Sequence, residues 1–325
     1  MAFAAIAVAQ GAGVSGQHWA RQRERGSFFW MKLTLQLTRL FGRKGVAPLL
    51  YLIVLYFFLT GKTARNSIRQ YYQNLSDWSQ RSELAPGSGK TFAQFMAFAS
   101  SLLDKFDVWH GRLRPEQLDV DDPHDVRQQS HSGSGRGQML VGAHLGNLEV
   151  CRALAEAGNK VRMNVLVHTG HAENFNRLLQ ESGASNLRLI EVSQLDAATM
   201  LQLSQRLDRG EWLAIAGDRV SLSDTRKNQA DFLGQPAWFP QGPWLLAGLL
   251  ECRVNLFFCL KINGRYRICL EHFAERIEWT RRTREQVLQQ SIQQFADRLA
   301  QRCLQAPQQW FNFYPFWNTD EHSNP

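Results

Sequence analysis

The stretch that decides the fold is QMLVGAHLGNLEVCRALAEAG, residues 138–158. It opens as a short apolar run, breaks at two glycines, and continues with apolar residues at helical spacing. A buried strand followed by a helix is typical of a crossover unit in an α/β sheet. His144 stands at the end of the predicted strand, and Glu149 lies in the first turn of the predicted helix, which Asn147 can cap.

Outward from this stretch, further segments have the composition of strands, and the first of them alternate with helical patterns. This alternation predicts a largely parallel sheet with crossover helices. The last two strand segments are separated by the turn signal NGR, which predicts an antiparallel hairpin. The predicted fold class is therefore α/β, with a mixed, mostly parallel sheet flanked by helices. The other strand segments are residues 161–168, 186–192, 211–218, 254–262 and 266–273.

The front of the chain is basic. In residues 1–72, ten lysines and arginines face the single acid Glu24, and the whole chain has a formal charge of +8. Two apolar runs, 27–41 and 47–61, lie among these bases. The second run is shorter than the roughly 20 residues that a bilayer span needs. We therefore expect residues 1–118 to be a helical region that lies on an anionic membrane surface. An ordinary buried helix pair is the alternative.

Composition also predicts the remaining organisation. Residues 119–137 are polar and rich in Gly and Ser, which predicts an exposed connection. Residues 138–310 would form the α/β domain, and 311–325 an aromatic and then polar tail. Within that domain, residues 283–303 have the pattern of an amphipathic helix. The five cysteines are odd in number and lie in apolar runs, which favours reduced core thiols over disulfides or a metal site.

Two motifs have weaker support. APGSGKT, residues 85–91, matches only the end of a phosphate-binding loop, and the polar segment before it is not a strand. We expect a helix that begins at the cap Thr91 instead. A histidine followed five residues later by an acid occurs twice, as His144 with Glu149 and as His168 with Glu173. Spacing alone does not choose between these pairs, and each taken singly is more often structural.

The context favours His144. It lies at the carboxyl end of a predicted central strand, where open α/β sheets place their ligands. From the first helical turn, the Glu149 carboxylate can bind one ring nitrogen and fix the tautomer. The other nitrogen of His144 is then able to accept a proton, which is the chemistry of a general base.

The phrase AHLGNLE, residues 143–149, resembles the signature of the glycerolipid and lysophospholipid acyltransferase superfamily. Within it, the chain resembles the bacterial lipid A late (lauroyl/myristoyl) acyltransferase family. Further blocks resemble that family in the same order, among them GDR at 217–219, DFLGQPAWFPQGPWLLAGL at 231–249 and QQWFNFYPFW at 308–317. VLVHTGHAENFN, residues 165–176, departs from the lipid A branch. It looks nearer to relatives associated with aryl-polyene pigment lipids.

The resemblance implies transfer of an acyl chain from acyl carrier protein (acyl-ACP) or coenzyme A (acyl-CoA) to a hydroxyl of a membrane lipid, at the cytoplasmic face of the inner membrane. His144 would be the base and Glu149 its orienter, with no metal or bound cofactor. Asp218 and Arg219 would be substrate-binding residues, with Arg219 polarising the thioester carbonyl or binding a phosphate. Further substrate-binding residues would be Asn147, His168, His171, Asn174 and Arg177, with Phe232, Trp238 and Phe239 lining an acyl pocket or else packing as a structural loop.

Three other functions stay open at this point. The same pair would serve a thioesterase or lipid hydrolase with water as the acceptor. A lipid-binding protein without catalytic activity would use the pair only structurally. Nucleic acid is disfavoured as a partner, because the aromatic residues among the bases fall in apolar helices rather than on an exposed stripe.

Overall fold

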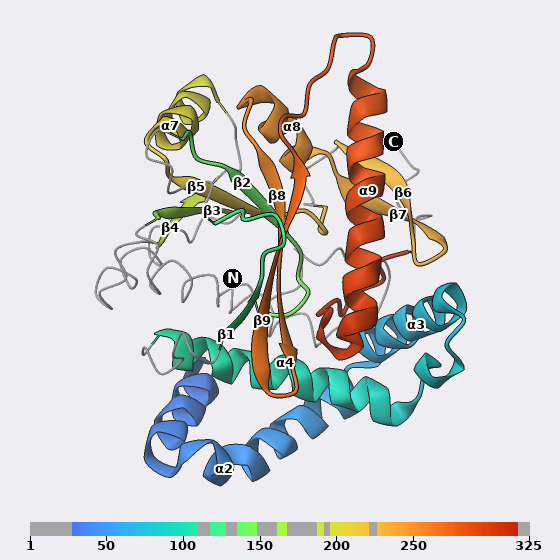
Figure 1. The fold of residues 1–325 in the computed structure, drawn as a ribbon. Coiled ribbons are helices and arrows are strands. Elements are labelled where there is room, and N and C mark those ends of the chain that lie inside the picture. The colour runs from blue at the N-terminus through green and yellow to red at the C-terminus, as the bar shows by residue number, and fades with distance from the viewer. Residues whose placement is uncertain are drawn as a thin grey trace. The chain divides into compact units, whose positions relative to one another are not determined.

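The computed structural model describes residues 28–109, 118–127, 135–147, 161–167, 187–191, 196–220 and 226–317 (Figure 1). The chain forms two compact units. Unit 1 contains Met1–Asp104, Asp231–Trp238 and Cys303–Pro325, and unit 2 contains Lys105–Ala230 and Phe239–Arg302. Both units combine separate parts of the chain, whereas the predicted boundaries divide it into consecutive segments.

Unit 2 is built on a seven-stranded sheet in the order β1-β9-β8-β2-β5-β3-β4. Neighbouring strands are parallel except for the antiparallel pair β8–β9. The predicted fold class and the terminal hairpin are thus confirmed. The strands are β1 (Leu118–Asp121), β2 (Met139–Gly142), β3 (Met163–Val167), β4 (Leu187–Glu191), β5 (Trp212–Ala216), β8 (Val254–Ile262) and β9 (Arg265–Ala274).

Both faces of the central strand β2 are buried, as its continuous apolar sequence predicts. Leu140 belongs to an apolar cluster on one face of the sheet, together with Met163, Trp212 and Phe257. On the other face, Gly217 lies against Val141 and against Phe295 of α9 (Arg284–Gln305). The predicted amphipathic helix is α9, and its apolar face is fully buried at Leu288, Ile292, Phe295, Ala296 and Leu299.

Two hairpin turns explain one success and one error of the sequence-based prediction. Between β8 and β9, Asn263 and Gly264 have φ values of 50° and 79°. A pair of positive φ values defines the tight hairpin turn that Asn-Gly favours. Leu233 and Gly234, with φ values of 56° and 73°, make the same kind of turn between β6 (Lys227–Phe232) and β7 (Gln235–Pro240). Leu-Gly is a weak signal for this turn, and the strands predicted from the sequence do not include β6 or β7.

Strand β1 also went unpredicted. It begins at the edge of the stretch 119–137, which the sequence analysis treated as an exposed connection. Its sequence LDVD offers only two apolar residues, and it pairs with β9 at the end of the sheet. Later in the same stretch, Val126 and Gly137 are buried. Such a short, acidic edge strand has almost no signal in its own sequence.

Unit 1 contains three long helices. They are α2 (Phe28–Thr60), α3 (Lys62–Ser79) and α4 (Ser88–Trp109), of which residues up to Asp104 belong to this unit. Gly42, with φ 68°, breaks α2 into two helical parts. The helix predicted to begin at Thr91 begins at Ser88 instead, so the predicted start is wrong. The amide and the hydroxyl of Thr91 both donate to the Gly87 carbonyl, which places Thr91 inside the first turn.

The segment predicted as an aromatic tail lies in the core of unit 1. Trp310 is completely buried, and its ring packs against Tyr71 of α3, Phe232 and Phe316. The Gln94 side chain of α4 donates to the Trp310 carbonyl. These contacts tie the end of the chain to the N-terminal helices.

In the part of the chain that the structure describes, no single helix has the length and apolar composition of a membrane span. The pair Gly45–Thr60 and Lys62–Ser79 meets those criteria jointly, with a bend of 88° between the two helices.

Four of the five cysteines are buried free thiols, as predicted for core positions. Burial raises the pKa of Cys252 to about 11 and also raises the pKa of Cys269. Thiols held in the neutral form are poor nucleophiles. The other two are Cys259 and Cys303, while Cys151 lies outside the described residues.

Glu211, directly before β5, ties α7 (Ala197–Asp208) to the sheet. Its carboxylate is bound by Arg206 at 3.1 Å, by Arg209 at 3.0 Å and by the Asn164 amide at 2.9 Å. Burial alone would raise the Glu211 pKa, but these partners outweigh burial and lower it below the ordinary 4.5. The carboxylate is therefore ionised at neutral pH.

We expect Glu211→Gln to lower the free energy of unfolding by about 1–3 kcal/mol at pH 7. A depressed native pKa gives stability that is complete above the ordinary pKa and is lost as the pH falls below it. The difference from wild type should therefore shrink below pH 4.5. Urea unfolding of both proteins at pH 7 and below pH 4.5 measures this difference in the free energy of unfolding. A difference that stays the same at both pH values would contradict the stabilising role of the ionised Glu211 carboxylate.

Candidate active site

His144 and Asp218 meet at the carboxyl ends of two neighbouring parallel strands. Gly142 at the end of β2 is paired with Ala216 at the end of β5. The Gly217 amide continues the ladder by donating to the Gly142 carbonyl at 2.8 Å. Two residues beyond the paired ends, the chain places His144 on one strand and Asp218 on the other. Ligands of open α/β sheets bind at this edge.

The Asp218 carboxylate holds His144 through two hydrogen bonds. One oxygen, Oδ1, lies 2.8 Å from Nδ1 of the imidazole, and the other accepts from the His144 backbone amide at 2.9 Å. Asp218 is 1% exposed, whereas the His144 side chain is 26% exposed. The carboxylate is thus buried beneath an imidazole that reaches the surface.

The carboxylate stays ionised in this position. Burial alone would raise the Asp218 pKa, but the charge of His144, its hydrogen bonds and the charge of Arg219 lower the pKa below its ordinary value. An ionised carboxylate can only accept hydrogen bonds, so Nδ1 of His144 carries the hydrogen. Nε2 is then the nitrogen that carries the lone pair. This arrangement suits a general base whose protonated form is stabilised by a buried negative charge.

The loop after His144 is fixed against β8. Gly146 forms a bridge with Cys259, and the Asn147 amide donates to the Cys259 carbonyl at 2.9 Å. Gly146 has φ 76°, and a Cβ atom there would lie 1.9 Å from the Cys259 carbonyl oxygen. Glycine is needed here for both its backbone conformation and its lack of a side chain.

We expect Gly146→Ala to lower the free energy of unfolding by more than about 2 kcal/mol and to reduce activity, because the loop must move away from β8. Gly264→Ala is the matched control. Gly264 has φ 79°, but no atom lies within 4 Å of the position of an added Cβ. Gly264→Ala should lower the free energy of unfolding by only about 1 kcal/mol. Equal losses in urea unfolding of the two variants would show that the close approach to Cys259 is unimportant.

Several other predicted site residues have defined positions. Arg219 follows Asp218 and is partly buried, and Asn147 is 2% exposed. Phe232 is buried in unit 1 and stacks on Trp317. Phe239 is buried in unit 2 against Phe295. Residues 232–239 lie in the β6–β7 hairpin rather than in a structural loop, which was the alternative to an acyl pocket, and Trp238 is partly exposed there.

The remaining predicted residues lie outside the part of the chain that the structure describes. They are Glu149, His168, Glu173, His171, Asn174 and Arg177. Their roles stay predictions. Among the residues that are described, no group of three or more His, Cys, Asp or Glu side chains is arranged to hold a metal ion.

Sequence reasoning found Asp218 but missed what it contacts. The residue was grouped with substrate-binding positions because it lies in the GDR block. The signal for the true contact was present, since both His144 and Asp218 follow the ends of predicted strands. Finding it requires knowing that β5 lies next to β2, although β3 and β4 come between them in the sequence.

Comparison with known proteins identifies one family. The family model described as "Bacterial lipid A biosynthesis acyltransferase" matches residues 80–319, which is more than half of the chain. A comparison with curated proteins gives no match. The matched region includes β2, β5 and the residues His144 and Asp218.

Proposed function

The chain belongs to the bacterial lipid A biosynthesis acyltransferase family, and we propose that it transfers a fatty acyl chain from an acyl-carrier thioester to a hydroxyl of a membrane lipid, with His144 as the general base. The observation that carries this proposal is the contact between His144 and Asp218, 2.8 Å apart at the carboxyl ends of β2 and β5. Family membership supports acyl transfer as the reaction class.

In the proposed reaction, Nε2 of His144 takes the proton of the acceptor hydroxyl as its oxygen attacks the thioester carbonyl carbon. The carbon–sulfur bond then breaks, and the leaving thiolate receives that proton from the imidazolium. Asp218 keeps the imidazole in the required tautomer and stabilises the imidazolium between the two proton transfers. Arg219 is the neighbouring cation, suited to the negative charge that develops on the carbonyl oxygen or to a phosphate.

Asp218 therefore takes the orienting role that the sequence analysis gave to Glu149. Both carboxylate oxygens of Asp218 are bound to His144, so we assign this residue to the imidazole rather than to the substrate. Glu149 stays a candidate for a further contact near the base. Acyl transfer by Glu149→Gln should be measured beside the His144 and Asp218 variants.

We propose acyl-ACP or acyl-CoA as the donor and a lipid A-like or aryl-polyene lipid as the acceptor. The formal charge of +8 supports a carrier or a membrane surface of opposite charge. A donor panel measured with and without a lipid extract separates the possibilities. Acyl lipid as the product supports transfer, whereas free fatty acid alone would indicate a thioesterase or lipid hydrolase.

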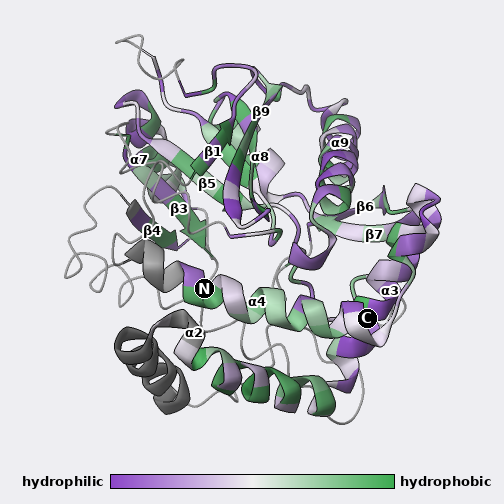
Figure 2. Ribbon diagram, turned by 60° about the horizontal axis from the view of Figure 1, so that its bottom comes forward, coloured by the Kyte–Doolittle hydropathy of each residue, from purple (hydrophilic) through white to green (hydrophobic). Residues whose placement is uncertain are grey.

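We also propose that unit 1 contacts the anionic face of the inner membrane on the cytoplasmic side. Figure 2 shows hydrophobic residues along most of the coloured part of α2. Tyr51, Leu52, Tyr56 and Leu59 are 49–63% exposed. The spacing of Leu52, Tyr56 and Leu59 places them on one face of the helix. The exposed Lys62 follows at the start of α3. Apolar and aromatic residues beside basic ones are typical of segments that lie in a membrane interface.

The double variant Leu52→Ser/Leu59→Ser is expected to bind phosphatidylglycerol vesicles at least about tenfold more weakly, because two leucines no longer enter the bilayer. Leu201→Ser is the matched control, since this α7 residue is equally exposed, at 61%, in unit 2. Vesicle sedimentation at low and high salt measures both. Binding of wild type should weaken with salt. Equal binding of the double variant and wild type would show that this face of α2 does not contact the membrane.

A further inference from the structure

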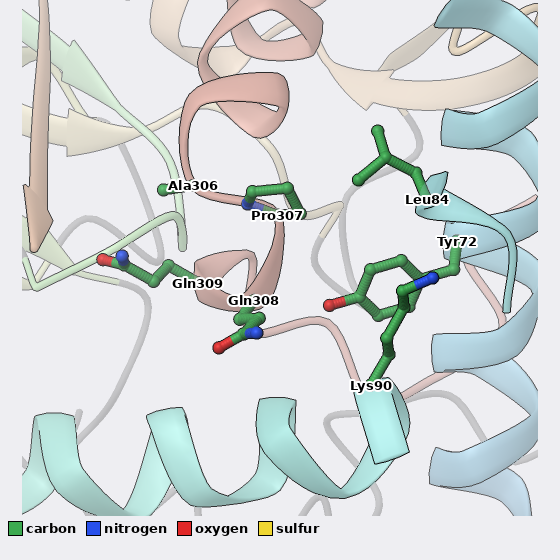
Figure 3. Close-up of a pocket in the computed structure, with 7 residues that line it drawn as sticks. All are labelled: Tyr72, Leu84, Lys90, Ala306, Pro307, Gln308 and Gln309. Atoms are coloured by element: carbon green, nitrogen blue, oxygen red, sulfur yellow. The ribbon is translucent and has the colours of Figure 1, made fainter. Parts of the chain in front are cut away.

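A second site lies in unit 1, apart from the residues of the proposed reaction. It is a pocket of about 240 Å³ between α3, the start of α4 and the segment 306–309 (Figure 3). Its apolar walls include Leu84 and Pro307, and its polar groups come from Tyr72, Lys90 and Gln308.

The Tyr72 hydroxyl is a buried donor that still needs an acceptor. The side chain is 1% exposed, and in the described part of the chain its hydroxyl has no hydrogen-bond partner. Figure 3 shows the hydroxyl pointing away from α3, toward the segment 306–309. Its neighbour Tyr71 donates to the Pro307 carbonyl at 3.0 Å. Burial raises the Tyr72 pKa, so the phenol keeps its proton. Buried donors in folded proteins are nearly always paired.

Lys90 brings a positive charge to the same pocket. Its ammonium donates to the carbonyls of Glu83 at 2.5 Å and Ala85 at 2.7 Å. These contacts fix the position of the ammonium, but neither carbonyl neutralises its charge. An ammonium has three donors, and these two partners use only two of them. The exposed amide of Gln308 lies at the rim.

We propose that this pocket binds a phosphate group, held by the Lys90 ammonium, the Tyr72 hydroxyl and the Gln308 amide. A phosphate presents several acceptor oxygens around one centre, so it can accept from three donors that approach from different sides. A carboxylate offers only two oxygens in one plane. Lysine is a common phosphate ligand because it acts as a point charge. The phosphate would belong either to a lipid headgroup or to free inorganic phosphate.

The position of Lys90 explains the partial motif in APGSGKT without a nucleotide site. The chain before it forms α3 and the short 3-10 helix Ser82–Leu84, and no strand precedes the loop in residues 28–90. A nucleotide-binding loop requires a strand there. The lysine of the motif nevertheless lines the same pocket as the Tyr72 hydroxyl, which suits a single phosphate group.

Titration calorimetry of the full chain with inorganic phosphate tests the proposal. Tyr72→Phe and Lys90→Met should each weaken phosphate binding by about tenfold or more, because each removes one donor. Tyr72→Phe loses only an oxygen atom that is unpaired in the free protein, so its fold should be at least as stable as wild type. Arg281→Met removes an equal charge from an exposed position of unit 2, outside the pocket, and should leave binding unchanged. Equal affinity in wild type and both pocket variants, or no binding by wild type, would overturn the proposal.

A second arm identifies the source of the phosphate. Tyr72→Phe changes no charge, so it leaves general attraction to an anionic surface intact. If the group belongs to a lipid, this variant should bind phosphatidylglycerol vesicles more weakly than wild type. If only inorganic phosphate binding falls, free phosphate is the ligand. Neither arm uses acyl transfer, so failure here and failure of the proposed reaction are distinguishable.

Discussion

Replacing Asp218 by asparagine is expected to slow acyl transfer roughly 10²- to 10⁴-fold. The amide has the same shape, but it carries no negative charge and offers a donor as well as an acceptor. The imidazole of His144 is then no longer held in the tautomer with the lone pair on Nε2, and its protonated form loses the buried charge that stabilises it. Initial rates of acyl transfer over a range of pH measure the effect.

The pH dependence separates this role from a purely structural one. The depressed pKa of Asp218 means that its carboxylate is ionised at every pH above its ordinary 3.8. Its contribution to folding is therefore complete above that pH and is lost only as the pH falls below it. At neutral pH, removing the charge should make protonation of His144 harder and move the acidic limb of the rate profile to lower pH.

Asp208→Asn is the matched control for Asp218→Asn. Asp208 is an exposed residue that pairs with Arg136 at 2.8 Å, so its loss should leave both the rate and the pH profile unchanged. Rates of Asp218→Asn equal to those of this control would contradict the role of Asp218. A fall in rate with an unshifted profile would reduce Asp218 to a packing residue.

His144→Ala is expected to slow acyl transfer by a similar factor, roughly 10²- to 10⁴-fold, because the proposed base that accepts the hydroxyl proton is then missing. His124→Ala, at an exposed position of the same unit, should keep full activity. His168→Ala tests the second histidine–acid pair. Activity that survives in His144→Ala and is lost in His168→Ala would move the reaction to that pair and contradict the proposed base.

The sequence predicts the central sheet well, because its strands are buried on both faces. Continuous apolar runs such as 139–141 and 256–260 allow few alternatives to a strand in an α/β fold. The Asn-Gly turn between β8 and β9 is equally specific, since both residues tolerate positive φ. These features place His144 at the carboxyl end of a central strand before any strand order is known.

The sequence does not predict elements whose stability comes from distant partners. Strand β1 has four residues, two of them aspartates, and it exists because β9 pairs with it. The hairpin β6–β7 turns on Leu-Gly, where leucine adopts φ 56°. The contact between His144 and Asp218 joins residues 74 positions apart, and it follows from strand order rather than from any local pattern.

The measurement that tests the central claim most directly is acyl transfer by the purified wild-type chain and by His144→Ala. Each is incubated with acyl-carrier thioesters and a bacterial membrane lipid extract, and mass spectrometry identifies the products. We predict a lipid whose mass has increased by one acyl chain with wild type, and no such product above background with His144→Ala. Free fatty acid as the sole product, or equal transfer by both proteins, would contradict the account.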